Sequence, residues 1–184
     1  GHAGTLDPLA TGLLIVCTGK MTKRISEFQA QEKEYTGTML LGSTTPSYDL
    51  ETVVDNIFPV DHISNELIHT TVLQFIGEIP PQHSAKWSNG ERAYEKARRG
   101  EVAELKSSIV TVTAFEITAI NMPCVDFKVV CSKGTYIRSL VNDFGKSMNS
   151  GAHLVSLCRT RIGSYSLNDA MEVDRFVKKI QDSN

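Results

Sequence analysis

The chain opens on GHAGTLDPLATG, residues 1–12, where three glycines and a proline surround a single acid, Asp7. Glycine lets the backbone bend sharply and approach a ligand closely, and Pro8 keeps the preceding residue out of the helical region. Asp7 is therefore expected on a stiff loop, directly before an apolar run at residues 13–17. From these residues alone it is either a turn residue that binds nearby backbone N–H groups, the commoner role, or a catalytic carboxylate.

The composition is that of an ordinary globular domain. The chain has 184 residues, of which 41% are hydrophobic and 22% charged, and its length fits one domain. Its four cysteines form no CxxC pair, so reduced thiols are expected rather than a disulfide framework or a zinc site. No apolar run approaches the ~18 residues of a membrane-spanning helix, and a cytoplasmic protein is expected. The net charge of −2 does not by itself indicate nucleic-acid binding, because such proteins are usually basic.

Hydrophobic periodicity predicts strands and helices that do not alternate regularly. Strands are predicted over 13–17, 33–42, 102–105, 109–120, 125–131 and 159–167, with a short extended piece at 51–54. Helices are predicted over 21–31, 64–75, 91–99, 135–148 and 173–181, and Ser64 is a plausible N-cap. The pattern indicates an α+β fold with a largely antiparallel sheet.

The opening stretch resembles the catalytic motif of the TruB family, the tRNA pseudouridine-55 synthases. Further similarity lies, in the family's order, at Lys33-Glu34-Tyr35, 80–100, 131–138 and 151–163. The resemblance implies the pseudouridine synthase fold, a mixed and mostly antiparallel central sheet flanked by helices, with a cleft across it. It also implies one catalytic domain over residues 1–184. Because a Lys-Pro stretch usual upstream in the family is absent from this sequence, we expect the domain to be N-terminally incomplete. Because the sequence ends soon after the last predicted helix, we expect no separate C-terminal RNA-binding domain.

Pseudouridine formation breaks the N1–C1′ bond of uridine, turns the base over and joins C5 to C1′. A carboxylate can serve as the nucleophile or stabilise the sugar. By resemblance, Asp7 is this carboxylate, Arg138 is the cation that keeps it ionised, and Tyr35 is the tyrosine that stacks on the target base. From the residues alone, Arg138 could equally be a surface arginine and Tyr35 a core tyrosine. Whether Asp7 attacks C1′, attacks C6 or removes a C2′ proton stays open.

The family also implies contacts to the substrate. A uridine in folded RNA must be extruded, at a cost of a few kcal/mol, and stacking on aromatic faces offsets this by ~1–3 kcal/mol per base. The substrate-binding candidates are His2, Tyr136, Leu157 and Lys23. Residues 80–100 match an RNA-binding thumb, in which the candidate RNA contacts are Arg92, Lys96, Arg98 and Arg99. A loop histidine, a core leucine and solvated basic residues are the alternative interpretations.

The sequence therefore predicts an isomerase that converts the T-loop uridine at position 55 of tRNA to pseudouridine. The expected partner is the T-arm of tRNA, and no cofactor, metal, membrane or obligate protein partner is expected for what should be a monomer. An RNA-binding or tRNA-folding module, with catalysis secondary or lost, is the alternative function. A uridine isomerase of ribosomal or small nuclear RNA, of the related dyskerin type, is a third and weaker hypothesis.

Overall fold

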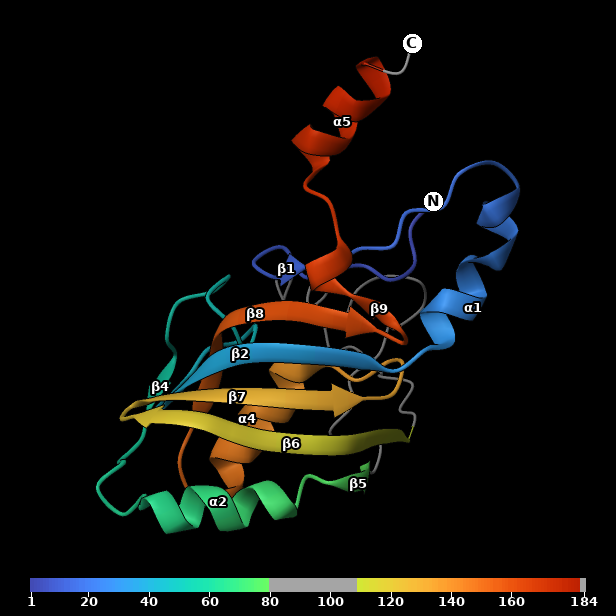
Figure 1. The fold of residues 1–184 in the computed structure, drawn as a ribbon. Coiled ribbons are helices and arrows are strands. Elements are labelled where there is room, and N and C mark those ends of the chain that lie inside the picture. Colours follow the sequence, from blue (N-terminus) through green and yellow to red (C-terminus); the bar gives the residue numbers. More distant parts are fainter. Residues whose placement is uncertain (80–108, 183–184) are drawn as a thin grey trace.

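The computed structural model describes residues 1–79 and 109–182, and its centre is a seven-stranded sheet. The strands lie in the order β1-β8-β2-β7-β6-β5, with the short β9 paired to β8 (Figure 1). Their bounds are β1 Thr11–Gly12, β2 Lys33–Leu41, β5 Gly77–Ile79, β6 Val110–Asn121, β7 Cys124–Cys131, β8 Ala152–Ile162 and β9 Tyr165–Ser166. Only β1 and β8 run parallel among these pairs, so the described sheet is mixed and mostly antiparallel, as predicted. A separate two-stranded sheet is formed by β3 (Ser43–Thr44) and β4 (Asn56–Ile57).

Strand β2 lies between β8 and β7 and pairs with both along its length. Its side chains alternate between the two faces of the sheet, as the sequence predicted. Met39 and Leu41 are buried in the core, and Tyr35 packs against the same core. Thr36 and Thr38 consequently point to the opposite face.

Helices α2 (Asn65–Leu73) and α4 (Ile137–Ser147) complete the core; Figure 1 shows α4 behind the sheet. The apolar side of α4 is buried as its spacing predicted, and Phe144 contacts the rings of both Phe75 and Phe115. Ser64 caps α2 by accepting a hydrogen bond from the Leu67 amide at 3.1 Å, which confirms the predicted N-cap. The face of β2 that carries Tyr35 is therefore also the face covered by α4.

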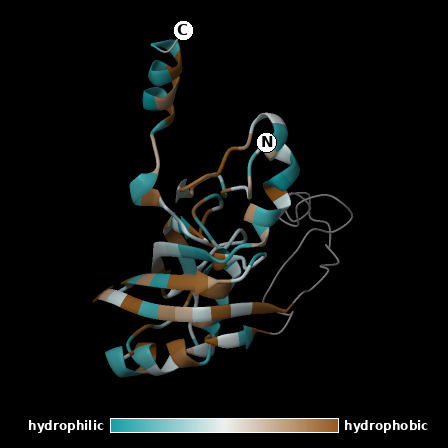
Figure 2. Cartoon of the chain, turned by 45° about the vertical axis from the view of Figure 1, so that its right-hand side comes forward, coloured by the Kyte–Doolittle hydropathy of each residue, from teal (hydrophilic) through white to brown (hydrophobic). Residues whose placement is uncertain are grey.

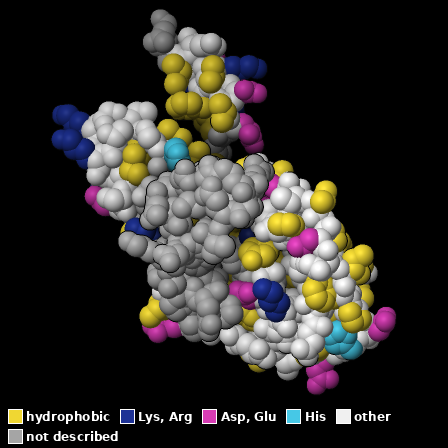
Figure 3. Space-filling view, turned by 180° about the vertical axis from the view of Figure 1, so that it is seen from behind, with side chains coloured by type: hydrophobic (Ala, Val, Ile, Leu, Met, Phe, Trp, Pro, Cys, Tyr) yellow, Lys and Arg dark blue, Asp and Glu magenta, His cyan; other side chains and the backbone are white. Residues whose placement is uncertain are grey.

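Two helical segments extend from this body. The 3₁₀ helix η1 (Gly19–Arg24) continues into α1 (Ile25–Ala30), and η3 (Leu167–Asp169) leads to α5 (Val173–Gln181). Helix α5 stands clear of the sheet (Figures 1 and 2). Its hydrophobic side chains gather on one side of the helix (Figure 3), and they are Val173, Phe176, Val177 and Ile180.

Some predicted elements differ from those observed. The strand predicted at 13–17 is absent: β1 covers only Thr11–Gly12, and an isolated bridge between His2 and Val16 follows. The predicted extended piece at 51–54 is also wrong, because the nearest strand, β4, begins at Asn56. Strand β8 begins at Ala152 rather than at 159, since two register shifts interrupt its side-chain alternation. The helix predicted at 91–99 and the strand at 102–105 lie outside the described residues.

Candidate active site

The acid Asp7 lies in a loop whose glycines have left-handed backbone conformations. Gly4 has φ +101° and Gly12 has φ +106°, a region that residues with a Cβ atom rarely enter. Between them, the Ala10 amide donates to the Asp7 carbonyl at 2.9 Å and closes a turn after Pro8. The turn interpretation therefore describes the backbone of Asp7, while its side chain is free to serve another role.

The Asp7 carboxylate is held by Arg138, which is 131 positions away in the sequence. Arg138 Nε donates to Oδ2 at 2.8 Å, and Nη2 donates to Oδ1 at 3.3 Å. Such a two-point contact fixes the plane of a carboxylate as well as its position. Side-chain exposure is 11% for Arg138 and 34% for Asp7, so the pair is partly withdrawn from water yet remains open on the acid's side. The structure thus brings together the predicted acid and its predicted cation.

A second carboxylate, Asp49, faces the same guanidinium and was missed by the sequence analysis. Its Oδ2 lies 3.7 Å from Arg138 Nη1, which also donates to the Ser47 carbonyl at 3.1 Å. Asp49 Oδ1 accepts from Ser47 Oγ at 2.6 Å and from the Glu51 amide at 2.9 Å. Arg138 therefore links Asp7 to the loop of residues 45–52, which follows β3. The available signal was a Ser-x-Asp pattern in a polar loop, which is typical of a side chain bound to its own backbone.

The loop that carries Asp49 is held in a strained conformation. Tyr48 has φ +62°, which is uncommon for a residue other than glycine. Its carbonyl accepts from the Leu154 amide at 2.9 Å, and Thr45 Oγ1 donates to the Asp49 carbonyl at 2.7 Å. Surrounding contacts therefore determine the position of Asp49, and strain of this kind concentrates at functional sites.

Tyr35 lies opposite Arg159 in the pairing of β2 with β8. Burial raises the pKa of the Tyr35 hydroxyl above its ordinary value, and the charges of Cys131 and Asp7 act in the same direction. The Arg159 guanidinium opposes this rise through its charge and a side-chain hydrogen bond. Tyr35 is therefore a neutral phenol at physiological pH, electrostatically coupled to Asp7 and to the buried Arg159.

The remaining predicted residues are spread more widely. Leu157 is buried on β8 opposite Gly37, and Tyr136 is half-buried at the N-cap of α4. His2 is exposed at its bridge to Val16, and Lys23 is exposed on η1, where Lys and Arg side chains gather at the outer end of the segment (Figure 3). The candidate RNA contacts Arg92, Lys96, Arg98 and Arg99 lie outside the described residues.

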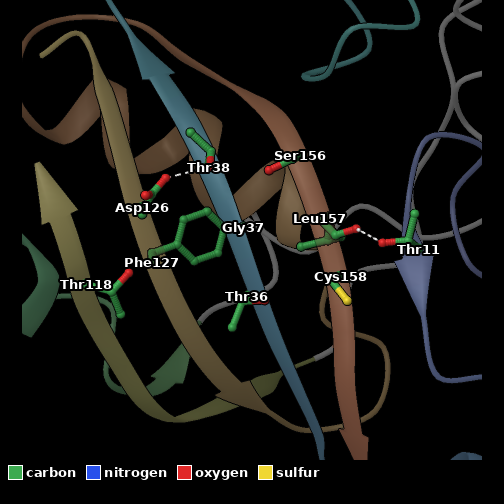
Figure 4. A pocket seen from close by; sticks show the side chains of 10 residues that line it. All are labelled: Thr11, Thr36, Gly37, Thr38, Thr118, Asp126, Phe127, Ser156, Leu157 and Cys158. Carbon is green, nitrogen blue, oxygen red and sulfur yellow. Dashed lines mark hydrogen bonds between the residues drawn. The ribbon is translucent and has the colours of Figure 1, made fainter. Parts of the chain in front are cut away.

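A hollow of about 300 Å³ lies on the sheet between β1, β8, β2 and β7 (Figure 4). Polar side chains line much of it, and Thr38 donates to Asp126 at 2.6 Å there. Thr11 donates to the Leu157 carbonyl at 3.4 Å at its other side. Because Thr36 and Thr38 point away from the face of Tyr35, the side of the hollow that they line belongs to the opposite face of the sheet.

Within residues 1–79 and 109–182, no group of three or more His, Cys, Asp or Glu side chains is arranged to hold a metal ion. Among the helices of that same part of the chain, none is long and apolar enough to cross a membrane.

Comparison with known proteins gives consistent results. Residues 1–137 match the family model described as TruB family pseudouridylate synthase, N-terminal domain. A protein of Flavobacterium johnsoniae named tRNA pseudouridine synthase B is 60% identical over 184 residues, an alignment that covers 98% of this chain and 80% of the relative. Its namesake in Phocaeicola vulgatus is 52% identical over 179 residues, covering 96% of this chain and 76% of the relative.

Solved structures share the fold. A chain in "Crystal Structure of a Cbf5-Nop10-Gar1 Complex" superposes with a TM-score of 0.71 at 27% identity, and all of this chain matches 48% of that one. A chain in "Structure of H/ACA RNP bound to a substrate RNA containing 2'-deoxyuridine" gives a TM-score of 0.70 at 25% identity, with 46% of that chain covered. This chain thus spans a little under half the length of each of these two chains. The fold is that of the pseudouridine synthases, and the chain belongs to the TruB family of pseudouridylate synthases.

Proposed function

We propose that this chain converts the T-loop uridine at position 55 of tRNA into pseudouridine, with Asp7 as the carboxylate that acts on the bound nucleotide. Family membership and the relatives named tRNA pseudouridine synthase B support the reaction and the RNA. The single observation that carries the assignment of Asp7 is its two-point ion pair with Arg138. An aspartate that only completed a turn would not need a guanidinium supplied by helix α4.

The reaction is an isomerisation, so its atoms and electrons balance within one nucleotide. The N1–C1′ bond breaks, a C5–C1′ bond forms, the proton on C5 is lost and N1 gains a proton. No electron acceptor or additional group is consumed, and we propose no cofactor. The protein must supply a negative charge beside the sugar, side chains that bind the detached base, and a proton acceptor.

Asp7 supplies the negative charge, and Arg138 fixes the orientation of its carboxylate. Because Nε and Nη2 each bind one carboxylate oxygen, Asp7 is held in one orientation before the substrate arrives. Preorganisation of this kind lowers the barrier because little rearrangement is needed as charge develops. Attack on C1′, attack on C6 and removal of the C2′ proton all use the same positioned oxygen.

Tyr35 is proposed to stack on the base and to take part in removing the C5 proton. Burial raises the pKa of its hydroxyl, so Tyr35 enters the reaction protonated and must release its own proton before it can accept the one on C5. Leu157 and Tyr136 are proposed to contact the base, His2 to pack beside the extruded nucleotide and Lys23 to reach a phosphate.

The T-arm itself is proposed to bind residues 80–100 through Arg92, Lys96, Arg98 and Arg99. RNA is generally recognised by its shape, its backbone and splayed loop bases, and clustered cations bind phosphates on an otherwise acidic surface. We propose that the chain acts as a monomer without an obligate protein partner.

The direct test uses a tRNA transcript labelled with tritium at C5 of uridine. The enzyme should release tritium, and chemical mapping should place the pseudouridine at position 55. A matched transcript with cytidine at that position should release none. Release from both transcripts would refute the assignment to the T-loop, and RNA binding without release would instead support an RNA-binding or tRNA-folding module.

A further inference from the structure

Arg159 is the largest fully buried side chain in the described part of the chain, with 2% of its surface exposed. A guanidinium is always charged and is rarely buried without a partner. Within residues 1–79 and 109–182, no carboxylate forms a salt bridge with Arg159. Its burial therefore needs another explanation.

The guanidinium of Arg159 binds the backbone of the Asp7 loop at three points. Nε donates to the Leu13 carbonyl at 2.8 Å, Nη2 to the Gly4 carbonyl at 3.0 Å and Nη1 to the Thr5 carbonyl at 3.4 Å. Gly4 and Thr5 precede Asp7, and Leu13 follows it. One side chain thus holds both ends of the loop that presents the acid.

The backbone of Arg159 holds the same loop. Gly12 pairs with Arg159 in the parallel contact of β1 with β8, and the Leu13 amide donates to the Arg159 carbonyl at 2.7 Å. The approach is so close that a Cβ atom on Gly12 would lie 2.3 Å from that carbonyl oxygen. The loop is therefore fixed against β8 by main-chain and side-chain contacts of one residue.

A bulge in β8 sets the direction of the Arg159 side chain. Glu34 pairs with Arg161 and Tyr35 pairs with Arg159, so Thr160 is an extra residue between two consecutive pairs. In a regular strand, Arg159 and Arg161 would share a face, but the extra residue places them on opposite faces. Arg161 consequently binds Glu32 at 3.1 Å on one side, while Arg159 points to the side of Tyr35.

We propose that Arg159 is a positioning residue for the reaction, which holds the Asp7 loop in one fixed arrangement against β8, on the face of the sheet that carries Tyr35, through a single guanidinium. The inference rests on the proposed function, because it assigns a task to Arg159 only if Asp7 and Tyr35 act on the substrate. Lysine could keep the charge but could not reach three carbonyl groups at once. Methionine would fill a similar space without charge or donors.

The test compares Arg159→Lys and Arg159→Met with two matched controls. Arg161→Met removes an arginine from the same strand but from the opposite face, which carries none of the site residues placed by the described part of the chain. Ile68→Ala removes buried side-chain volume from α2 and lowers the overall stability without touching the loop. Each protein is assayed for single-turnover pseudouridine formation, for tRNA affinity and for backbone hydrogen exchange.

We expect Arg159→Met to slow the single-turnover step by about 100-fold, because small displacements of a reacting group have effects of this size. Arg159→Lys should recover part of the rate, and the Kd for tRNA should change by less than about threefold in both variants. Hydrogen exchange should accelerate in residues 1–17 while β6 and β7 keep their protection. Both controls should retain the wild-type rate per folded molecule.

Two results would overturn the proposal. One is a wild-type rate in folded Arg159→Met; the other is exchange that accelerates throughout the chain, as expected for Ile68→Ala, which would mean a purely structural role. An inactive wild-type protein would instead count against the proposed function. Hydrogen exchange would still show whether Arg159 stabilises the Asp7 loop. A failure of the proposed function is therefore distinguishable from a failure of the proposed role of Arg159.

Discussion

Arg138 Nη1 lies 3.7 Å from Asp49 Oδ2, on the side of the guanidinium opposite to the two nitrogens that bind Asp7. Asp49 is 6% exposed and is itself fixed by Ser47 and the Glu51 amide. The buried Asp49 therefore orients Arg138, and Arg138 in turn orients the more exposed Asp7. The series of contacts runs from the loop of residues 45–52 through Arg138 of α4 to the loop of residues 1–12.

Replacing Asp49 by asparagine tests whether this series of contacts supports the reaction. The amide oxygen of Asn can still accept from Ser47 and Glu51, but the negative charge that faces Arg138 is lost. We expect Asp49→Asn to lower kcat about tenfold, which corresponds to ~1.4 kcal/mol of transition-state stabilisation, and to leave tRNA affinity nearly unchanged. Asp126→Asn, which alters a carboxylate bound to Thr38 on the other sheet face, is the control. Equal rates for the two variants would count against a role for Asp49.

Arg138→Lys separates charge from geometry. Lysine keeps the positive charge but has one nitrogen, so it cannot bind both Asp7 oxygens and the Ser47 carbonyl together. We expect the single-turnover rate to fall by about 100-fold, the size seen when one preorganised donor is removed from an active site. If Arg138→Lys retained the full rate, positive charge alone would suffice and the two-point contact would have no catalytic role.

The backbone of the Asp7 loop can be tested with two glycine substitutions. Gly12 has φ +106° and Gly77 has φ +109°, so an alanine at either position carries a similar conformational strain of about 1–2 kcal/mol. A Cβ atom at Gly12 would meet the Arg159 backbone at 2.3 Å, whereas one at Gly77 would have no atom within 4 Å. Gly12→Ala should therefore lower the Tm more than Gly77→Ala and also slow the reaction. Identical Tm values would contradict the tight contact between the loop and β8.

Stability should depend on pH through Lys33, whose side chain is buried and donates to the carbonyls of Gln29 and Gln31. Burial, together with the Arg159 charge, lowers the pKa of Lys33 from 10.5 to about 8. Between these two values the unfolded chain holds a proton that the folded chain has released, so the free energy of unfolding rises with pH. Below the folded pKa this contribution is lost.

Urea unfolding of the wild type and of Lys33→Met measures this contribution. From about pH 7 to about pH 10, the difference in unfolding free energy should shift by ~1–3 kcal/mol in favour of the wild type. Burial raises the pKa of Cys131 to about 11, which acts in the opposite direction, but both proteins contain Cys131 and its effect largely cancels. A difference that stays constant with pH would contradict the burial of a titrating amine.

Much of this fold could be predicted because the relevant signals are local. The alternation in β2, the apolar side of α4 and the Ser64 cap are all visible within a dozen residues, and the structure confirms them. The pairing of Asp7 with Arg138 was predicted only from the resemblance to a family. No periodicity or spacing could have indicated it, because the two residues are joined by the folding of separate segments.

The features that could not be predicted depend on tertiary contacts. The bulge at Thr160 is invisible in the sequence, where Arg159 and Arg161 would be assigned to the same face. Asp49 lies in a polar loop that has no period, and only the approach of Arg138 distinguishes it from an ordinary turn residue. The apolar run at 13–17 resembled a strand, but the Asp7 loop holds it in place with a single bridge instead of a ladder.

The most direct test of the central claim is tritium release from C5-labelled tRNA by Asp7→Asn, measured together with its tRNA affinity. Asparagine has the shape of aspartate but lacks the charge. We expect no detectable release above background, with a Kd for tRNA within about threefold of the wild type. Release at a rate comparable to the wild type would show that another group acts on the nucleotide and would contradict the assignment of Asp7.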